Sequence, residues 1–419
     1  MTADGRDSAE ALDRADGLAG WVDEFVVTDP AVVYFDGNSL GRLPRRTAVR
    51  LRRVVDQEWG GDLVRAWQTW IDMPSEVGDR VGRAVLGAQA GQVVVCDSTT
   101  VNLYKLAAAA LDARRNRGVI VTDDGNFPTD RYVLEGLATA RSLELRQVTT
   151  HPVNGLRHDA VAAAVDDSVG LVSFSHVDYR SGAINDVAGL TRIAHRAGAL
   201  TLWDLSHSAG AVDVDLDGWG VDLAVGCSYK YLHGGPGSPA WLYVRRPFQH
   251  ELMPPVWGWF AQADQFGMGP LFQPDGGMRR WLAGTPPILG LAAVDEGVSI
   301  LEKVGMAAVR EKAIDLSTYA QSLWTAWLDP LGFGFGSPLD PARRGSHLAL
   351  RHPEAERLSR AMIDEAAVIP DFRAPDTLRI GLAPLSTRFA EVWDGFDRLR
   401  RLASDQAWKR FGDTSRRVT

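Results

Sequence analysis

Residues 93–113 read VVVCDSTTVNLYKLAAAALDA, a β-branched run followed by a helical one. The valines predict a short strand at residues 93–96, and Ser98 or Thr99 is placed to cap the helix that follows. The same alternation continues outward to about residue 245. Further strands are expected at residues 118–121, 143–148, 170–174, 200–203 and 222–225, and helices at residues 129–140 and 187–197.

Alternating strands and helices predict an α/β fold, with a largely parallel sheet covered by helices on both faces. In such sheets ligands bind beyond the carboxyl ends of the strands, so we expect the functional residues there. The flanking regions differ in pattern. Residues 1–60 are mostly helical around a turn-rich stretch at 36–41, residues 246–285 predict a long ordered loop, and helical patterns return at 288–304 and 307–328. We expect three parts: an N-terminal helical segment (1–60) that joins the small domain, a large ligand-binding domain (61–300) and a small C-terminal α+β domain (301–419).

Composition excludes several classes of function. The 419 residues include 45 Lys plus Arg and 53 Asp plus Glu, a net charge of −8 without a basic block. Such a chain is a poor candidate for binding nucleic acid. Nothing approaches 18 consecutive apolar residues and the N-terminus lacks an apolar stretch, so we expect a cytoplasmic protein without membrane contact. Two cysteines cannot form a disulfide framework, and the histidine spacing disfavours a metal site.

The main chemical signal is Lys230, which follows an expected strand and precedes the Gly-rich turn HGGPG at 233–237. A lysine buried at a strand end has a lowered pKa and a nucleophilic amine, and it can form a Schiff base with an aldehyde cofactor. The alternative is a surface lysine beside a tight turn.

Asp204 ends another strand, 26 residues before Lys230, and His207 follows it closely. A carboxylate there can pair with a pyridinium nitrogen and keep a cofactor ring electron-accepting. The alternative is an Asp that caps a turn, with His207 packed nearby. A carboxylate and a lysine at successive strand ends are what a pyridoxal 5′-phosphate (PLP) site requires.

Two further motifs fit such a site. The hydroxyls of residues 98–100 at a helix N-terminus could bind a phosphate, although Ser and Thr caps are common. Phe127 at a strand–helix turn could stack on a flat ring, or could only pack locally. The chain has no G-x-S-x-G, P-loop or G-x-G-x-x-G motif, which weighs against serine hydrolases, NTPases and nucleotide-dependent dehydrogenases.

Together these motifs resemble the kynureninase family, PLP-dependent hydrolases of the aspartate-aminotransferase-like fold (fold type I), from about Tyr34 to Phe389. The motifs that carry the resemblance are YFDGNSLG (34–41), STTVNL (98–103), NFPTD (126–130), DLSH (204–207), CSYKY (227–231), GWF (258–260) and GTPP (284–287). The resemblance implies a large domain with a mostly parallel, seven-stranded-type sheet between helices and a small C-terminal α+β domain. It also implies hydrolytic Cβ–Cγ cleavage of L-kynurenine to anthranilate and L-alanine in a homodimer with shared active sites.

The resemblance also assigns roles to residues. Lys230 would form the Schiff base, Asp204 would pair with the pyridine nitrogen, and Phe127 would stack on the ring. Of the remaining cofactor residues, Thr99, Thr100 and Tyr229 would hold the phosphate, Trp259 and Thr285 would complete that end from the other subunit, and Asp130, Ser175 and His207 would line the cofactor. Lys230 and Tyr229 are the catalytic candidates, with Tyr229 as general acid/base.

Arg379 would bind the substrate α-carboxylate, because its planar fork suits a bidentate contact. Asn38 and Ser39 would lie near the substrate, or could simply form a turn. Trp67, with Gly284 and Thr285, would shape the aryl pocket and favour L-kynurenine over its 3-hydroxy derivative. The alternative for Trp67 is a core aromatic packed on Trp70.

Three other functions stay open at this point. One is another PLP enzyme of the same fold, such as a cysteine desulfurase or lyase, but neither Cys96 nor Cys227 lies in a plausible flexible loop. A second is a related enzyme of secondary metabolism that prefers 3-hydroxykynurenine or another ring-substituted kynurenine. The third is a non-catalytic scaffold, against which the intact Lys230, Asp204 and Tyr229 argue.

Overall fold

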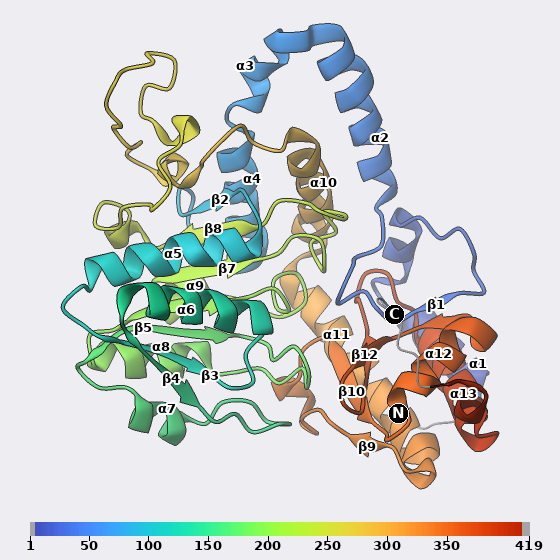
Figure 1. Cartoon of the computed structure of the whole chain (residues 1–419). Coiled ribbons are helices and arrows are strands. Elements are labelled where there is room, and N and C mark those ends of the chain that lie inside the picture. The colour runs from blue at the N-terminus through green and yellow to red at the C-terminus, as the bar shows by residue number, and fades with distance from the viewer. Residues whose placement is uncertain (1–4, 413–419) are drawn as a thin grey trace.

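The computed structural model describes residues 5–412, which build a large and a small part around two separate sheets (Figure 1). The large sheet has seven strands in the order β2-β8-β7-β6-β5-β3-β4. Its strands are β2 (Val93–Val95), β3 (Val119–Asp123), β4 (Glu144–Val148), β5 (Val169–Ser175), β6 (Leu200–Asp204), β7 (Leu223–Gly226) and β8 (Trp241–Val244). The α/β class and the mostly parallel sheet predicted from the sequence are confirmed.

The five strands β7, β6, β5, β3 and β4 pair in parallel, whereas β8 runs antiparallel to both β7 and β2. The parallel strands therefore end at one edge of the sheet. In register, Ser175 at the end of β5 lies beside Asp204 at the end of β6, and Asp204 lies beside Val225 of β7. This edge brings together the side chains that follow each strand.

Helices cover both faces of the large sheet. On one face lie α5 (Thr99–Ala113) and α6 (Pro128–Arg141), and α7 (His158–Ala164) and α8 (Val187–Arg196) pack on the other; α9 (Leu216–Trp219) is a short turn before β7. Alternate residues of one strand enter different cores: Ile120 packs with α5 and α6, and Val119 and Val121 face the opposite side. Burial on both faces explains why the inner strands β3, β5, β6 and β7 are largely apolar in sequence, whereas the edge strand β4 (ELRQV) is not.

The small part contains a four-stranded antiparallel sheet in the order β12-β13-β10-β9. Its strands are β9 (Gly334–Phe335), β10 (His347–Arg351), β12 (Asp371–Arg373) and β13 (Thr377–Gly381), and its helices are α11 (Met306–Leu323), α12 (Ala355–Ala366) and α13 (Phe389–Ser404). The N-terminal region joins this part, because β1 (Val33–Tyr34) pairs in parallel with β11 (Val368–Ile369) and α1 (Arg6–Ala15) packs on α13.

An arm projects from the body between these two parts. Helix α2 (Arg45–Arg53) continues into a π-helical segment, Val54–Asp62, before the chain returns through α3 (Trp67–Trp70) and α4 (Met73–Val81) beside α10 (Ile288–Val304). The loop region expected at 246–285 has only short 3-10 helices, at Arg246–Phe248, Trp259–Ala261 and Met278–Trp281. No helix within residues 5–412 is long and apolar enough to cross a membrane.

Candidate active site

A cavity of about 200 Å³ opens at the edge of the large sheet where the parallel strands end. Its walls are formed by Ser98, Thr99, Thr100, Phe127, Thr129, Asp130, Ser175, Val177, Tyr179, Asp204, Ser206, His207, Tyr229 and Lys230. These residues follow β2, β3, β5, β6 and β7 or begin the helices after them. The sheet topology thus gathers five separate sequence segments around one small volume.

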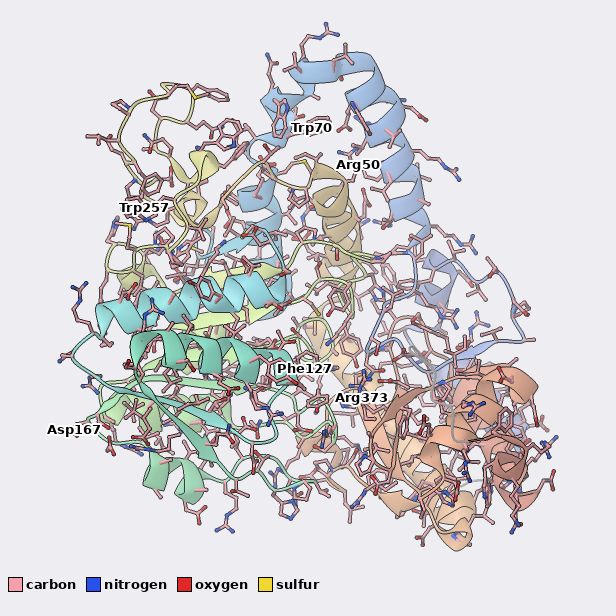
Figure 2. The ribbon with its side chains drawn as sticks, in the orientation of Figure 1. Arg50, Trp70, Phe127, Asp167, Trp257 and Arg373 are labelled. Carbon is pink, nitrogen blue, oxygen red and sulfur yellow. The ribbon has the colours of Figure 1, made fainter. Side chains whose placement is uncertain are left out.

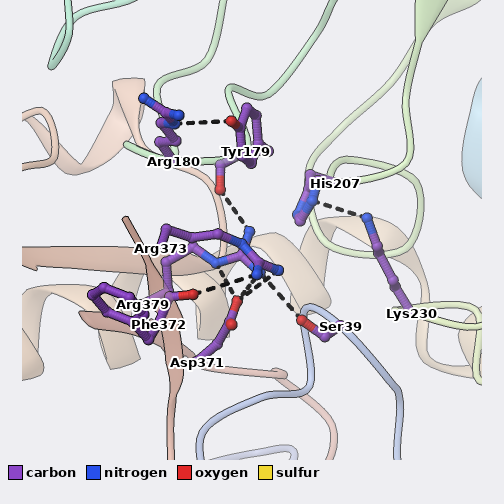
Figure 3. Close-up of polar contacts among 9 residues, drawn as sticks. All are labelled: Ser39, Tyr179, Arg180, His207, Lys230, Asp371, Phe372, Arg373 and Arg379. Atoms are coloured by element: carbon purple, nitrogen blue, oxygen red, sulfur yellow. Dashed lines mark hydrogen bonds and ion pairs between the residues drawn. The ribbon is translucent and has the colours of Figure 1, made fainter. Parts of the chain in front are cut away.

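Lys230 is a buried amine in the turn that follows β7. Its Nζ lies 2.9 Å from Nε2 of His207 (Figure 3). Burial lowers the pKa of Lys230, and the positive charges of Arg379 and Arg373 lower it further. Burial and the Lys230 charge also hold the pKa of His207 well below its usual value. A neutral amine is a nucleophile and a base, so a lowered pKa shifts Lys230 toward the form that covalent catalysis needs.

Two carboxyl groups stand on the cavity wall near Lys230. Asp204 is buried, and its Oδ1 accepts a hydrogen bond of 2.7 Å from the Ser206 amide at the end of β6. Asp130, in the first turn of α6, is buried as well, and burial together with the nearby Asp204 raises its pKa well above the usual range. Burial and the neighbouring Asp204 therefore favour the protonated form of the Asp130 carboxyl.

The mouth of the cavity combines a helix N-terminus with two aromatic rings. Thr99 and Thr100 open the 15-residue helix α5, whose free amides and dipole favour an anion. Phe127 caps α6 and is partly exposed, with its ring edge-on to Tyr179 at 5.2 Å. On the inner side, the Ser175 hydroxyl donates to Asn126 Oδ1 at 2.7 Å. A flat anionic ligand would meet an aromatic face and an anion site together.

The Kynureninase C-terminal domain model matches residues 309–399, and the Aminotransferase class-V model matches residues 75–327. Curated kynureninases of Burkholderia pseudomallei (strain 1106a) and Pseudomonas fluorescens are 40% and 39% identical to this chain. Both matches cover 96% of this chain. They cover 97% of the Burkholderia protein and 96% of the Pseudomonas protein. The chain belongs to the kynureninase family.

Solved structures confirm the fold that this family shares with other PLP enzymes. A cysteine desulfurase of Thermococcus onnurineus superposes with a TM-score of 0.78 at 20% identity, covering 89% of this chain and 95% of that one. A C-DES variant with glycine linked to its PLP cofactor gives 0.77 at 16% identity, covering 88% and 96%. At this identity the likeness shows the fold alone.

The cysteines of this kynureninase-family chain do not suit desulfurase chemistry. Cys96 and Cys227 are both buried. Burial raises the pKa of Cys96 to about 11 and also raises that of Cys227. A thiol in this state is not an effective nucleophile. The desulfurase alternative therefore has no support in the side chains.

PLP is the cofactor of this family, and the cavity fits it. An amine (Lys230), a carboxylate (Asp204), an aromatic face (Phe127) and an anion site at α5 surround one volume. Within residues 5–412, the buried atoms Asp130 Oδ2 and His207 Nδ1 have no hydrogen-bond partner. Buried polar atoms normally have partners, so these two atoms suit a polar ligand in the cavity.

Every residue predicted to bind the cofactor from within one subunit lines this cavity: Thr99, Thr100, Phe127, Asp130, Ser175, Asp204, His207, Tyr229 and Lys230. The predicted carboxylate-binding group lies beside it. Arg379 donates to the Tyr179 carbonyl at 2.6 Å and to Ser39 Oγ at 3.2 Å. Asn38 is buried, and its Oδ1 lies against Gly381, two residues after Arg379.

The other predicted residues lie outside this cavity in the single chain. Gly284 and Thr285 are exposed, and Trp259 is partly exposed with its ring 4.5 Å from that of Phe260. The Trp67 ring packs edge-on to Trp70 at 5.5 Å and 5.9 Å from Phe260. The aromatic packing is the alternative that the sequence left open for Trp67, and its role toward a substrate stays a prediction.

Ser98, whose hydroxyl the sequence offered as part of a phosphate site, also lines the cavity. The sequence analysis gave no role to four other wall residues, Thr129, Val177, Tyr179 and Ser206. Tyr179 and Val177 follow β5, so the strand-end argument used for Asp204 could have found them. Asp371 was missed too. It is the cross-strand partner of Arg379, and sequence alone does not reveal this register.

Proposed function

We propose that this chain hydrolyses L-kynurenine to anthranilate and L-alanine, with Lys230 and Tyr229 as its catalytic residues. The observation that carries the proposal is the buried Lys230 amine, whose pKa is lowered, in a cavity that also presents Asp204, Phe127 and the N-terminus of α5. Family membership supplies the reaction, and this arrangement supplies the groups that it needs.

Bound PLP supplies an electron sink that stabilises the negative charge left on the substrate Cα after proton removal. Asp204 would hold the ring nitrogen, Phe127 would cover the ring, and the amides and hydroxyls of Thr99 and Thr100 would bind the phosphate. Lys230 Nζ then accepts the Cα proton, because burial lowers its pKa and so favours the neutral, basic amine.

Tyr229 acts in the hydrolytic half of the reaction. The neighbouring Cys227 sulfur and burial raise the pKa of its hydroxyl, so the phenol keeps its proton. We therefore assign it first as the acid that protonates the substrate carbonyl oxygen while water adds to the γ-carbon. The adding water returns a proton to Tyr229. When the Cβ–Cγ bond breaks, one hydroxyl of the hydrated carbonyl gives its proton through Tyr229 to Cβ, and anthranilate leaves with the oxygen from water. The three-carbon remainder leaves as alanine once Lys230 has returned to Cα the proton that it took.

Substrate recognition would use the side of the site that belongs to the small part. Arg379 would bind the α-carboxylate, with Ser39 at its NH2 group and Asn38 next to it. Trp67, Gly284 and Thr285 would shape the aryl pocket. Trp67 has a single polar hydrogen and a large apolar surface, so it would leave a 3-hydroxyl poorly paired.

A second copy of the chain would complete the site. Large apolar side chains are exposed on two regions, the arm at 55–64 and the loop at 256–272. They are Val55, Trp59, Leu63, Val64, Val256, Trp257, Trp259, Phe266, Met268 and Leu271. Apolar surface on this scale marks an interface rather than a face left in water. In Figure 2, Trp70 at the end of the arm and Trp257 in the loop both lie in the upper half of the view. A homodimer would cover it and bring Trp259 and Thr285 to the partner's cavity.

The test of the proposed substrate is a comparison of kcat/KM for L-kynurenine and 3-hydroxykynurenine on the PLP-loaded protein. We expect L-kynurenine to be preferred by about ten- to a hundred-fold, the usual cost of an unpaired buried hydroxyl. A clear preference for the hydroxylated substrate would mean that the aryl pocket is built differently.

A further inference from the structure

Arg379 is held by an ion pair that the reaction scheme does not use. Asp371 on β12 and Arg379 on β13 are directly paired across the strands. Asp371 Oδ2 accepts a 2.7 Å hydrogen bond from Arg379 Nε and a second from NH2 (Figure 3). Both side chains are 2% exposed. The pair is therefore a fixed feature of the small sheet at its border with the cavity.

The contacts divide the guanidinium group into two edges. Asp371 takes the edge formed by Nε and NH2. The terminal NH1 and NH2 groups reach the Tyr179 carbonyl at 2.6 Å and Ser39 Oγ at 3.2 Å. Those two partners belong to the cavity wall and to the expected substrate side. An incoming carboxylate would therefore meet the terminal edge, where a neutral hydroxyl can give way to it.

A second arginine shares the same carboxylate oxygen. Arg373 NH2 lies 3.0 Å from Asp371 Oδ2, and its side chain is 38% exposed. Figure 2 places Arg373 on the side of the small part that faces Phe127. Because Arg373 also neutralises Asp371, this carboxylate orients Arg379 without cancelling its whole charge. A carboxylate shared by two guanidinium groups leaves the inner one able to bind a further anion.

We propose that Asp371 is a positioning residue for substrate binding: it presents the terminal edge of Arg379 to the substrate α-carboxylate, and Arg373 is the counter-charge that keeps this edge available. The proposal rests on the assignment of Arg379 as the carboxylate-binding residue under the proposed function. It predicts that Asp371 acts on the binding of the carboxylate and has little effect on the chemical step.

The experiment measures kcat and KM for L-kynurenine in PLP-loaded wild type, Asp371→Asn and Arg379→Met. Asp376→Asn is the matched control, because Asp376 lies on the turn between the same two strands and pairs with the exposed Arg351 at 2.7 Å. Assays at about pH 8 lie well above the pKa of about 6 that burial and Asp371 give the nearby Asp36, so the Asp36 charge stays constant.

Asp371→Asn should raise KM at least about ten-fold with kcat within about three-fold of wild type, while the control stays unchanged. A competitive inhibitor with the same aryl ketone and amine but no carboxylate should bind Asp371→Asn and wild type equally. A purely structural role would weaken both ligands and lower kcat, and would overturn the proposal. If Arg379→Met raises KM and Asp371→Asn does not, Asp371 has no positioning role although the carboxylate assignment stands. If Arg379→Met leaves KM unchanged, the assignment of Arg379 itself is wrong.

Arg373 provides the second variant if Asp371→Asn does not fold. Without Arg373, Asp371 would pair with Arg379 alone and cancel more of its charge. Arg373→Gln should therefore raise KM about three-fold or more, and Arg373→Lys, which keeps the charge, should restore it. Equal KM values for Arg373→Gln and wild type would overturn the proposal.

Discussion

Lys230 Nζ and His207 Nε2 lie 2.9 Å apart at the ends of neighbouring strands, and both groups are buried. Burial lowers the pKa of each, and the Lys230 charge lowers the pKa of His207 further. Burial thus favours the neutral form of the lysine amine. This relationship is the local basis for assigning Lys230 as nucleophile and base.

Tyr229→Phe should lower kcat by about 10²–10⁴-fold, the usual contribution of a positioned general acid, with PLP still bound. Tyr231→Phe is the matched control, because the buried Tyr231 hydroxyl contacts the Ser346 carbonyl at 3.4 Å and does not line the cavity. The measurement is kcat for wild type and both variants, together with the amount of PLP bound to each. A kcat for Tyr229→Phe within about three-fold of wild type would remove Tyr229 from the mechanism.

Mixing two inactive variants tests the shared active site. Lys230→Ala and Trp259→Ala homodimers, mixed and allowed to exchange subunits, should recover up to about a quarter of wild-type activity, because half of the dimers carry one intact site. Lys230→Ala mixed with Asp204→Ala should recover none, since both residues line the same subunit's cavity. Light scattering measures the molar mass in solution and so distinguishes a homodimer from a monomer. A fully active monomer would contradict the homodimer.

Trp67→His should shift substrate preference toward 3-hydroxykynurenine. The imidazole offers a partner for the extra hydroxyl, so the ratio of the two kcat/KM values should change by about ten-fold. The measurement compares both substrates on wild type and variant. If Trp67 only packs on Trp70 and Phe260, both kcat/KM values will fall together and their ratio will not change.

Asp123→Asn tests a buried carboxyl at the end of β3. Burial raises the pKa of Asp123 to about 7, although Thr150 Oγ1 donates to it at 2.8 Å. The folded protein thus holds a proton that the unfolded chain releases above about pH 4. The stability that Asp123 provides is fully present below about pH 4, where both the folded and the unfolded chain hold the proton. It is lost progressively as the pH rises from about 4 to about 7, because only the unfolded chain then releases the proton. The difference in free energy of unfolding between Asp123→Asn and wild type should therefore shift in favour of the variant by about 2–3 kcal/mol when the pH is raised from about 5 to about 8.

Urea unfolding of both proteins at the two pH values checks this expectation. The comparison of variant with wild type cancels the other titrating groups that the two proteins share. Parallel pH profiles would show that Asp123 titrates near its ordinary value in the folded protein.

Much of the fold was predictable because the central parallel strands are largely apolar and alternate with helical patterns. The strand-end argument located Asp204 and Lys230 correctly at one edge, since parallel strands end together. The sequence analysis expected no strand at residues 241–244, where β8 runs antiparallel to its neighbours.

The rest of the site depends on contacts between residues that are far apart in the sequence, which local sequence patterns do not reveal. Arg379 was assigned by resemblance alone, and its partner Asp371 follows from the register of two short strands. Trp259 and Thr285 lie away from the cavity of their own chain, so a single sequence or a single subunit cannot place them. Tyr179 follows a strand as Asp204 does, so the same strand-end argument could have found it.

The most direct test of the central claim is a product assay on the PLP-loaded protein with L-kynurenine, run beside Lys230→Ala. The account predicts anthranilate and L-alanine in equal amounts from wild type. For Lys230→Ala it predicts turnover reduced by at least about 10³-fold, with the same circular dichroism spectrum as wild type and without the visible absorbance of the lysine Schiff base. Turnover by Lys230→Ala at a rate comparable to wild type, or wild-type products other than this pair, would contradict the account.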